Sequence, residues 1–267
     1  MILIGEKLNS SIPSTLALFE QKDEAAIRSL ITKQEQAGAA YLDINTAICG
    51  ENELDRMLWA VEQVLGHSSC GIMLDTTDSA VMQQAVDAVL RGRDCPLLLN
   101  SATIDDRFDT VVSLAHKANA GVVGMPIDAD GMPHTLEEKC QKIDLLMKKL
   151  RAAKIPDTKI YLDVLVETLA TGGESAKVVL DTIRYVAQKY PQVNTTCGLS
   201  NVSFGLPKRA LVNSSFAAAA FAAGLSSAIL DPTSPSMRGT LAAMQAILGQ
   251  DEYCMDYITY IRDLEEL

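Results

Sequence analysis

Short apolar segments alternate with longer amphipathic segments along the whole chain. Each apolar segment is rich in Ile, Val and Leu, which is typical of a strand buried on both faces. Such strands are found in parallel sheets that helices cover on either side. The predicted strands are Ile2–Ile4, Tyr41–Ile44, Gly71–Leu74, Pro96–Leu99, Gly121–Met125, Lys159–Leu162, Thr195–Leu199 and Ser227–Leu230.

The segments between these strands place apolar residues three and four positions apart, as one face of a helix does. The predicted helices are Asp23–Ala37, Asn52–Leu65, Ser79–Leu90, Asp105–Ala118, Leu136–Ala153, Ser175–Tyr190, Ala210–Ala222 and Ser236–Leu248. Asp105 and Asp106 open one of them, where negative charge stabilises the positive end of the helix dipole. A further helix is predicted over Tyr253–Leu267.

Eight strand–helix pairs in 267 residues match the size and element order of a TIM barrel, an α/β fold in which eight parallel strands form a ring inside eight helices. No linker or shift in composition divides the chain. We therefore predict one domain over residues 1–267, with a short C-terminal helical extension. A doubly wound open sheet is the alternative, but its Gly-x-Gly-x-x-Gly turn is missing after the first strand.

The composition is that of a globular protein, with 48% hydrophobic and 21% charged residues. The 23 basic and 34 acidic residues give a net charge of −11, which argues against binding to nucleic acid or to an anionic membrane. Six scattered cysteines form no Cys-x-x-Cys pair, which favours free thiols in a reducing compartment. With no signal-peptide pattern and no apolar run long enough to cross a bilayer, we expect a cytoplasmic protein.

Polar residues follow almost every predicted strand at its carboxyl end, where barrel enzymes carry their catalytic residues. The main ones are Glu6, Asp43, Asp75, Asn100, Asp163, Asn201 and Asp231. Any one of them could instead cap the following helix, because Asp and Asn are favoured at helix N-termini. Their number favours a polar pocket.

The residue types in this pocket limit its chemistry. No histidine follows a strand and no cysteines have zinc-ligand spacing, so we predict no metal centre; a magnesium site from Asp43, Asp75 and Asp163 would need a phosphate-like partner. No lysine is placed to form a Schiff base. Carboxylates and amides together can bind a flat heterocycle through its N–H groups and its carbonyl. A pterin is one such ring among several.

Six short motifs occur in an order that is found in one enzyme family. They are Gly5-Glu6-Lys7-Leu8-Asn9, Leu42-Asp43-Ile44-Asn45, Leu74-Asp75-Thr76-Thr77, Leu99-Asn100-Ser101, Tyr161-Leu162-Asp163 and Gly198-Leu199-Ser200-Asn201-Val202-Ser203. The last motif, which Arg209 follows, is the most specific. With these motifs the chain resembles the pterin-binding methyltetrahydrofolate–corrinoid protein methyltransferases, whose barrel is shared by dihydropteroate synthase. The resemblance runs from the first strand to the eighth.

The resemblance implies a role for several of these residues. The residues that would hold the pterin ring are Asp75, Asn100 and Asp163. Asn201 would form a hydrogen bond near N5 of the pterin, the atom that carries the methyl group, and is the implied catalytic residue. The residues that would line the same pocket with smaller roles are Asp43, Gly198, Ser200 and Arg209.

The resemblance also implies the reaction and its partners. A methyl group would move between N5 of tetrahydrofolate (as 5-methyltetrahydrofolate) and the cobalt of a corrinoid, or cobalamin. The chain lacks the Asp-x-His-x-x-Gly motif of corrinoid-binding proteins, so a separate corrinoid protein would carry the cobalt. The resemblance further implies a homodimer. The motifs favour neither direction of transfer.

Two other functions stay open as alternatives. A pterin condensation like that of dihydropteroate synthase is disfavoured, because the Asn-Val-Thr-Pro-Asp-Ser-Phe motif of that enzyme is missing after the first strand. Its Ser-Arg-Lys motif is replaced by Phe204-Gly205-Leu206-Pro207-Lys208-Arg209. A non-catalytic folate-binding protein is the other alternative, because pterin-binding residues alone do not require catalysis.

Overall fold

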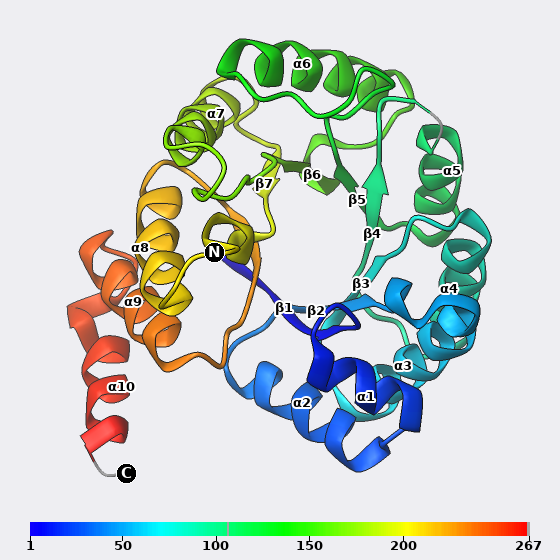
Figure 1. Cartoon of the computed structure of the whole chain (residues 1–267), viewed down its shortest axis with the longest axis horizontal. Coiled ribbons are helices and arrows are strands. Elements are labelled where there is room, and N and C mark those ends of the chain that lie inside the picture. Colours follow the sequence, from blue (N-terminus) through cyan, green and yellow to red (C-terminus); the bar gives the residue numbers. More distant parts are fainter. Residues whose placement is uncertain (106, 266–267) are drawn as a thin grey trace.

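Eight parallel β-strands form a ring at the centre of the computed structural model (Figure 1), which describes residues 1–105 and 107–265. The strands are β1 (Ile2–Asn9), β2 (Tyr41–Asn45), β3 (Gly71–Asp75), β4 (Leu97–Ala102), β5 (Gly121–Gly124), β6 (Ile160–Asp163), β7 (Asn194–Thr196) and β8 (Ser227–Leu230). Neighbours follow the chain order from β1 to β7, and β8 pairs with β1. A bridge between Gly198 and Ile229 closes the ring between the β7 and β8 segments.

Helices surround this ring on all sides (Figure 1). Those that follow the eight strands are α2 (Glu24–Gln36), α3 (Glu53–His67), α4 (Ser79–Arg91), α5 (Phe108–Ala118), α6 (Leu136–Ala152), α7 (Ser175–Lys189), α8 (Arg209–Ala222) and α9 (Pro235–Ile247). The architecture is therefore the predicted single-domain (β/α)8 TIM barrel. Each predicted strand and helix has its counterpart in the structure.

Some element bounds differ from the prediction. β1 continues to Asn9 because its ladder with β2 extends through polar residues that a hydrophobic pattern does not mark as strand. β7 is short because the chain turns directly into the 3-10 helix η3 (Leu199–Ser203). The helix expected from Asp105 begins at Phe108, and Asp106 lies outside the described residues.

One helix, α1 (Pro13–Gln21), has no counterpart among the predicted helices. Pro13 occupies its first turn, where the missing N–H of proline would have no helical partner. Thr15 and Phe19 are buried, and the Phe19 ring meets Trp59 edge-on with the ring centroids 6.3 Å apart. α1 therefore packs beside the carboxyl end of β1, next to α3.

The interior of the barrel is filled by the side chains of Ile4, Met73, Leu98, Val123 and Tyr161. A larger apolar layer separates the strands from the surrounding helices. Because the interior is packed, space for a ligand is left at the ends of the strands, as in other TIM barrels.

The predicted C-terminal helix is present as α10 (Met255–Glu265), and residues 266–267 lie outside the described part of the chain. The helix packs on α9: the Tyr260 hydroxyl donates to the Pro235 carbonyl over 3.1 Å, and the Arg238 guanidinium lies over the Tyr260 ring. No helix in the described ranges has the length and apolar composition needed to cross a membrane.

Candidate active site

A cavity of about 610 Å³ opens at the carboxyl ends of the strands. It is lined by all eight residues to which the sequence assigns a site role: Asp43, Asp75, Asn100, Asp163, Gly198, Ser200, Asn201 and Arg209. These residues are far apart in the sequence, and closure of the barrel brings them together. We therefore place the candidate active site in this main cavity.

The strand register aligns polar residues on one side of the main cavity. Asn45 pairs with Asp75, and Asp75 pairs with Asn100, in the parallel ladders of β2, β3 and β4. Asp43 lies two residues before Asn45 and so faces the same side of β2. The Asn45 amide donates to the Asp75 carboxylate over 2.7 Å. This side of the cavity is a row of carboxyl and amide groups.

The two carboxyl groups of this row, Asp43 and Asp75, both have raised pKa values. Asp43 is only 1% exposed, and burial raises the pKa of Asp43 well above its usual value. The charges of Asp75 and Glu6 raise it further. Burial also raises the pKa of Asp75, while the Asn45 hydrogen bond and the charge of Arg107 oppose that rise. Asp43 therefore favours its neutral form more strongly than Asp75 does.

Asp163, at the end of β6, is also buried but has partners. The Leu165 N–H donates to its carboxylate over 2.7 Å. Lys139 of α6 is 1% exposed, and its ammonium donates to the carbonyls of Val164 and Leu165 over 3.1 and 2.6 Å. Burial raises the pKa of Asp163 to about 6, and the Leu165 hydrogen bond and the Lys139 charge limit the rise. Asp163 is therefore mostly ionised above neutral pH.

Two buried oxygens at the main cavity, Oδ1 of Asp43 and Oδ1 of Asn100, accept no hydrogen bond from the described residues. A buried polar atom without a partner destabilises a protein by about 1–3 kcal/mol. A ligand that brings N–H groups would supply the missing donors. A pterin carries an amino group and ring N–H groups on one flat edge, so the donor and acceptor set of this cavity fits such a ring.

The segment from Gly198 to Arg209 brings the most specific sequence motif to the main cavity. A Cβ atom at Gly198 would lie 2.9 Å from Nδ2 of Asn201, so the Asn201 amide occupies space that a glycine leaves open. Arg209 donates to the Ser203 hydroxyl over 3.0 Å and to the Ser200 carbonyl over 2.8 Å. Arg209 therefore holds the η3 turn, and the turn presents Asn201.

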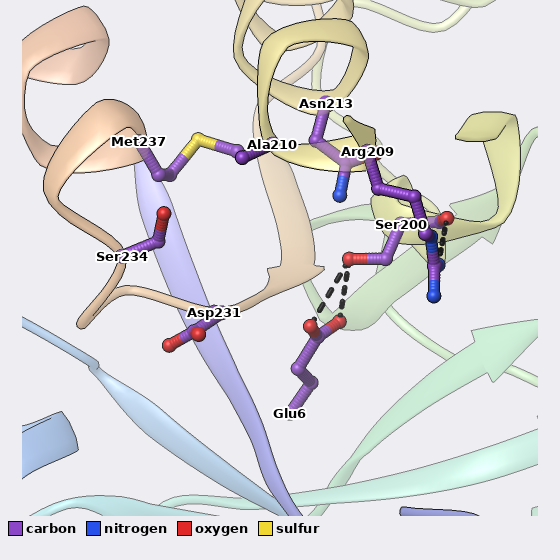
Figure 2. Close-up of a pocket in the computed structure, with 8 residues that line it drawn as sticks. All are labelled: Glu6, Ser200, Arg209, Ala210, Asn213, Asp231, Ser234 and Met237. Atoms are coloured by element: carbon purple, nitrogen blue, oxygen red, sulfur yellow. Dashed lines mark hydrogen bonds between the residues drawn. The ribbon is translucent and has the colours of Figure 1, made fainter. Parts of the chain in front are cut away.

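Glu6 also lines the main cavity, although the sequence assigns it no specific role. The Ser200 hydroxyl lies 3.0 Å from each of its carboxylate oxygens and donates to them (Figure 2). Burial raises the pKa of Glu6; the Ser200 hydrogen bond opposes this, and the nearby charge of Asp231 adds to it. Lys7 pairs with Asp231 over 2.8 Å.

A β-bulge in β1 orients Glu6. The ladder with β2 pairs Gly5 with Leu42 and then Leu8 with Ile44, so β1 has one residue more than β2 over this stretch. A bulge of this kind bends a strand and redirects its side chains, and bulges are common beside active sites. Because of the bulge, the side chain of Glu6 does not follow the simple alternation of side chains along a regular strand.

Side chains from two helices bond the backbone of Lys7 in the bulge. The Lys7 N–H donates to the side-chain oxygen of Gln34 from α2 over 2.9 Å. The Thr15 hydroxyl from α1 donates to the Lys7 carbonyl over 3.0 Å. A Cβ atom at Gly5 would lie 2.4 Å from that Gln34 oxygen, so glycine is needed for the Gln34 contact. The position of Glu6 is thus built into the fold.

A smaller cavity of about 200 Å³ adjoins the main one beside α8 and α9 (Figure 2). This side cavity is lined by Glu6, Ser200, Arg209, Ala210, Asn213, Asp231, Ser234 and Met237. Glu6, Ser200 and Arg209 line both cavities and therefore form the wall between them.

Sequence reasoning gives no site role to several other residues of the main cavity. They are Glu6, Asn9, Ser11, Ile12, Pro13, Met125, Phe204 and Ile229. Glu6 and Asn9 belong to the first family motif, so the motif itself was the available signal. Ile12 and Pro13 enter the cavity wall because α1 begins there, and α1 has no strong helical pattern.

The polar lining of the main cavity is mostly carboxyl, amide and hydroxyl groups, and Met125 is the one sulfur-containing side chain among its lining residues. The cysteines of the chain are free thiols, and none lines this cavity. Across residues 1–105 and 107–263, no three His, Cys, Asp or Glu side chains come together as a metal-binding group.

Comparison with known proteins identifies relatives over most of the chain. Residues 6–231 match the family described as pterin binding enzyme. Over 260 residues the chain is 33% identical to the methylcorrinoid:tetrahydrofolate methyltransferase of Eubacterium limosum, which covers 96% of this chain and 94% of that protein. It is 30% identical over 244 residues to the methionine synthase of Mycobacterium leprae, but spans only 20% of that protein.

Solved dihydropteroate synthases share the fold. The enzyme of Yersinia pestis in a sulfonamide drug complex has a TM-score of 0.68 at 16% identity, over 93% of this chain and 94% of that chain. The enzyme of Vibrio fischeri has a TM-score of 0.67 at 20% identity, over 93% of both chains. At these identities the likeness concerns the fold alone. The match over residues 6–231 and the Eubacterium limosum relative show that this chain belongs to the family of pterin-binding enzymes.

Proposed function

We propose that this protein is a methyltransferase that moves a methyl group between N5 of tetrahydrofolate and the cobalt of a corrinoid carried by a separate protein. The observation that carries the proposal is the 33% identity to a methylcorrinoid:tetrahydrofolate methyltransferase along 94% of that protein's length. The name of that relative favours transfer from the methylcorrinoid to tetrahydrofolate as the direction. The main cavity supports the same function because its acceptors suit a pterin.

The pterin ring is held by Asp75, Asn100 and Asp163 in this proposal. Asp163, ionised and fixed by the Leu165 N–H, accepts from the amino and ring N–H groups, since a carboxylate can accept two such bonds. The free Oδ1 of Asn100 accepts a further N–H. The residues that complete the pocket are Asp43, Gly198, Ser200 and Arg209.

Asn201 is the proposed catalytic residue near N5. Its amide can donate to the N5 lone pair or accept from a protonated N5 without changing its own charge. An interaction that strengthens as N5 gains positive charge lowers the barrier more than it lowers the ground state. The barrel otherwise contributes orientation, which makes methyl transfer between two held groups effectively unimolecular.

The corrinoid reaches this site on a partner protein. The cavity opens at the strand ends, and Phe204 at its rim is 68% exposed, so the approach to the pterin stays open to a large substrate. We further propose that the chain works as a homodimer in the cytoplasm and that residues 1–267 act as one unit. The free cysteines support a reducing compartment, and light scattering at micromolar concentration tests the dimer.

A single-turnover assay tests the function. The protein is mixed with tetrahydrofolate and methylcobalamin, a free stand-in for the corrinoid protein, and the cobalamin absorbance is followed. We expect methyl transfer by the unchanged protein, and about a ten- to thousandfold slower transfer by Asn201→Ala, with a smaller loss of folate affinity. Glu51→Gln, an exposed change on the same barrel end, serves as the control.

The same assay separates the alternatives. Folate binding without methyl transfer would indicate a non-catalytic folate-binding protein. Product formation from aminobenzoate and the pterin pyrophosphate would indicate a dihydropteroate synthase. Equal losses of affinity and rate in Asn201→Ala would place Asn201 among the ring-holding residues.

A further inference from the structure

We propose that Glu6 exchanges the proton of the pterin N5 with the side cavity through the hydroxyl of Ser200. This inference rests on the proposed methyl transfer and deepens it, because that reaction leaves a proton to be moved and Asn201 cannot keep one. Glu6 would be a second catalytic group of the site, acting as an acid in one direction and as a base in the other.

The first support is the position of Glu6 in the wall between the two cavities. Among the described residues, Glu6 is the only carboxylate that lines both of them. Asp43, Asp75 and Asp163 line the main cavity alone, and Asp231 lines the side cavity alone. A group that passes protons between a substrate and a second compartment must reach both, and Glu6 meets this condition.

The second support is the contact between Glu6 and Ser200. The Ser200 hydroxyl is 3.0 Å from both oxygens of Glu6 (Figure 2). Ser200 directly precedes Asn201, which we place near N5. A hydroxyl both donates and accepts, so it can pass a proton by receiving one and releasing another. The bulge of β1 and the Arg209 contacts hold both ends of this pair in place.

The charges around Glu6 suit a group that titrates. Lys7 and Asp231 pair with each other over 2.8 Å, and Arg209 is engaged by η3, so no cation forms an ion pair with the Glu6 carboxylate among the described residues. Burial and the neighbouring charge of Asp231 raise the pKa of Glu6, and Lys7 and Arg209 oppose them from a distance. On β2, burial raises the pKa of Asp43 and the charges of Asp75 and Glu6 raise it further.

The proton balance of the reaction fits this role. When tetrahydrofolate accepts a methyl group, the N5 lone pair forms the new N–C bond, the cobalt–carbon bond breaks and its electron pair stays on cobalt. As this bond forms, N5 gains positive charge and its original hydrogen passes as a proton to the Ser200 hydroxyl, while the hydroxyl's own proton passes to the Glu6 carboxylate. N5 ends neutral and Glu6 ends protonated. In the reverse direction, neutral Glu6 protonates N5 through Ser200, the electron pair of the reduced cobalt forms the new cobalt–carbon bond, and the N–C electron pair returns to nitrogen.

The test is the pH dependence of the single-turnover rate with tetrahydrofolate and methylcobalamin. In this direction Glu6 acts as a base, so the wild-type rate should rise as pH passes through the raised pKa of Glu6. Glu6→Gln should slow transfer by about a hundredfold and remove this rise, with folate affinity changed less than about threefold. Glu51→Gln, an exposed carboxylate outside both cavities, should keep both rate and profile.

A double-mutant cycle separates proton transfer from a structural role. Ser200→Ala should slow transfer by about tenfold, and the double variant Glu6→Gln/Ser200→Ala should be no slower than Glu6→Gln, because both residues serve one path. Additive losses, an unchanged pH profile in Glu6→Gln, or equal losses of affinity and rate would overturn the role of Glu6 alone. A wild-type protein that transfers no methyl group would overturn the proposed function, and the Glu6 role with it.

Discussion

Asp43 and Asp163 are two aspartates of one cavity with nearly equal burial, at 1% and 7% exposed, yet their surroundings differ. Asp163 has the Leu165 N–H on its carboxylate and the ammonium of Lys139 nearby. Asp43 has an oxygen without a donor, and its neighbours in charge are the carboxylates of Asp75 and Glu6. The pKa of Asp163 therefore stops at about 6, while the pKa of Asp43 is raised well above its ordinary value with nothing to oppose the rise.

Burial alone therefore does not set the charge of a carboxyl group. Burial acts on both groups in the same direction, and the local donors and cations decide the difference. The Asp163 side of the cavity thus offers a charged acceptor, and the Asp43 side offers a carboxyl group that favours its protonated form. A pterin that bridges them would meet two kinds of hydrogen-bonding group in one pocket.

The largest expected effect is on folate affinity. Asp163→Asn should weaken binding about ten- to a hundredfold at pH 7.5, because it replaces a charge-assisted hydrogen bond with a neutral one. Asp43→Asn should weaken binding less than about threefold, because an amide resembles a neutral carboxyl group. Isothermal titration calorimetry with tetrahydrofolate measures both, and equal losses would show that the two carboxyl groups do not differ in charge.

The next effect concerns the stability of the ligand-free protein. The unfolded chain releases the Asp43 proton near pH 3.9, whereas the folded chain keeps it to higher pH. The stability that Asp43 contributes is therefore complete below the unfolded pKa and is lost as pH rises through the folded one. This loss amounts to about 1.4 kcal/mol per pH unit. In Asp43→Asn the side chain does not titrate, so this loss of stability is absent.

Urea unfolding between pH 5 and pH 9 should show Asp43→Asn gaining stability relative to wild type as pH rises. Asp163→Asn should gain over a narrower window, from the unfolded value up to about pH 6, because the folded pKa of Asp163 is about 6. Parallel curves for wild type and Asp43→Asn would show that Asp43 is ionised in the folded protein.

A smaller effect should follow from removing the cation beside Asp163. Lys139→Met removes the charge that limits the rise in the pKa of Asp163. Asp163 should then become protonated at a higher pH, so as pH falls the variant should lose folate affinity before wild type does. At pH 6.5 the loss should be about three- to tenfold, and at pH 9 it should nearly disappear. Lys142→Met is the matched control, because Lys142 lies on the same helix as Lys139 but pairs with Asp128 instead.

The smallest expected effect on folate affinity comes from the row of carboxyl and amide groups on β2 to β4. Asn45→Ala removes the hydrogen bond that opposes the raised pKa of Asp75. The Asp75 carboxylate should then be harder to ionise, and folate affinity at pH 7 should fall about two- to fivefold, as for one ordinary hydrogen bond. The fall should lessen toward pH 9; a pH-independent loss would mean that Asn45 contacts the pterin directly.

The fold was predictable from the chain because barrel strands are buried on both faces and so appear as short apolar runs. The polar row was predictable for the same reason, since Asp75, Asn100 and Asp163 each follow such a run directly. The family motifs then added Asn201 and its neighbours. Local pattern was sufficient wherever one segment determines its own structure.

The remaining features depend on contacts between distant segments. Lys139 lies in the middle of an amphipathic helix, and only the packing of α6 against the end of β6 brings its ammonium under Asp163. Helix α1 has too short an apolar pattern to be recognised, and its start supplies Ile12 and Pro13 to the cavity. Glu6 follows the first apolar run, but the bulge that orients it is bonded by Gln34 and Thr15 from two other elements.

The extra residue of β1 limits which insertions and deletions this strand can accept in evolution or engineering without moving Glu6. Deleting one codon between Gly5 and Leu8 would give β1 and β2 the same number of residues over this stretch, but would remove or redirect Glu6. The proposed proton chemistry thus depends on a single extra residue in the strand. When such strands are aligned or transplanted between barrels, the length of this segment must therefore be preserved along with its sequence.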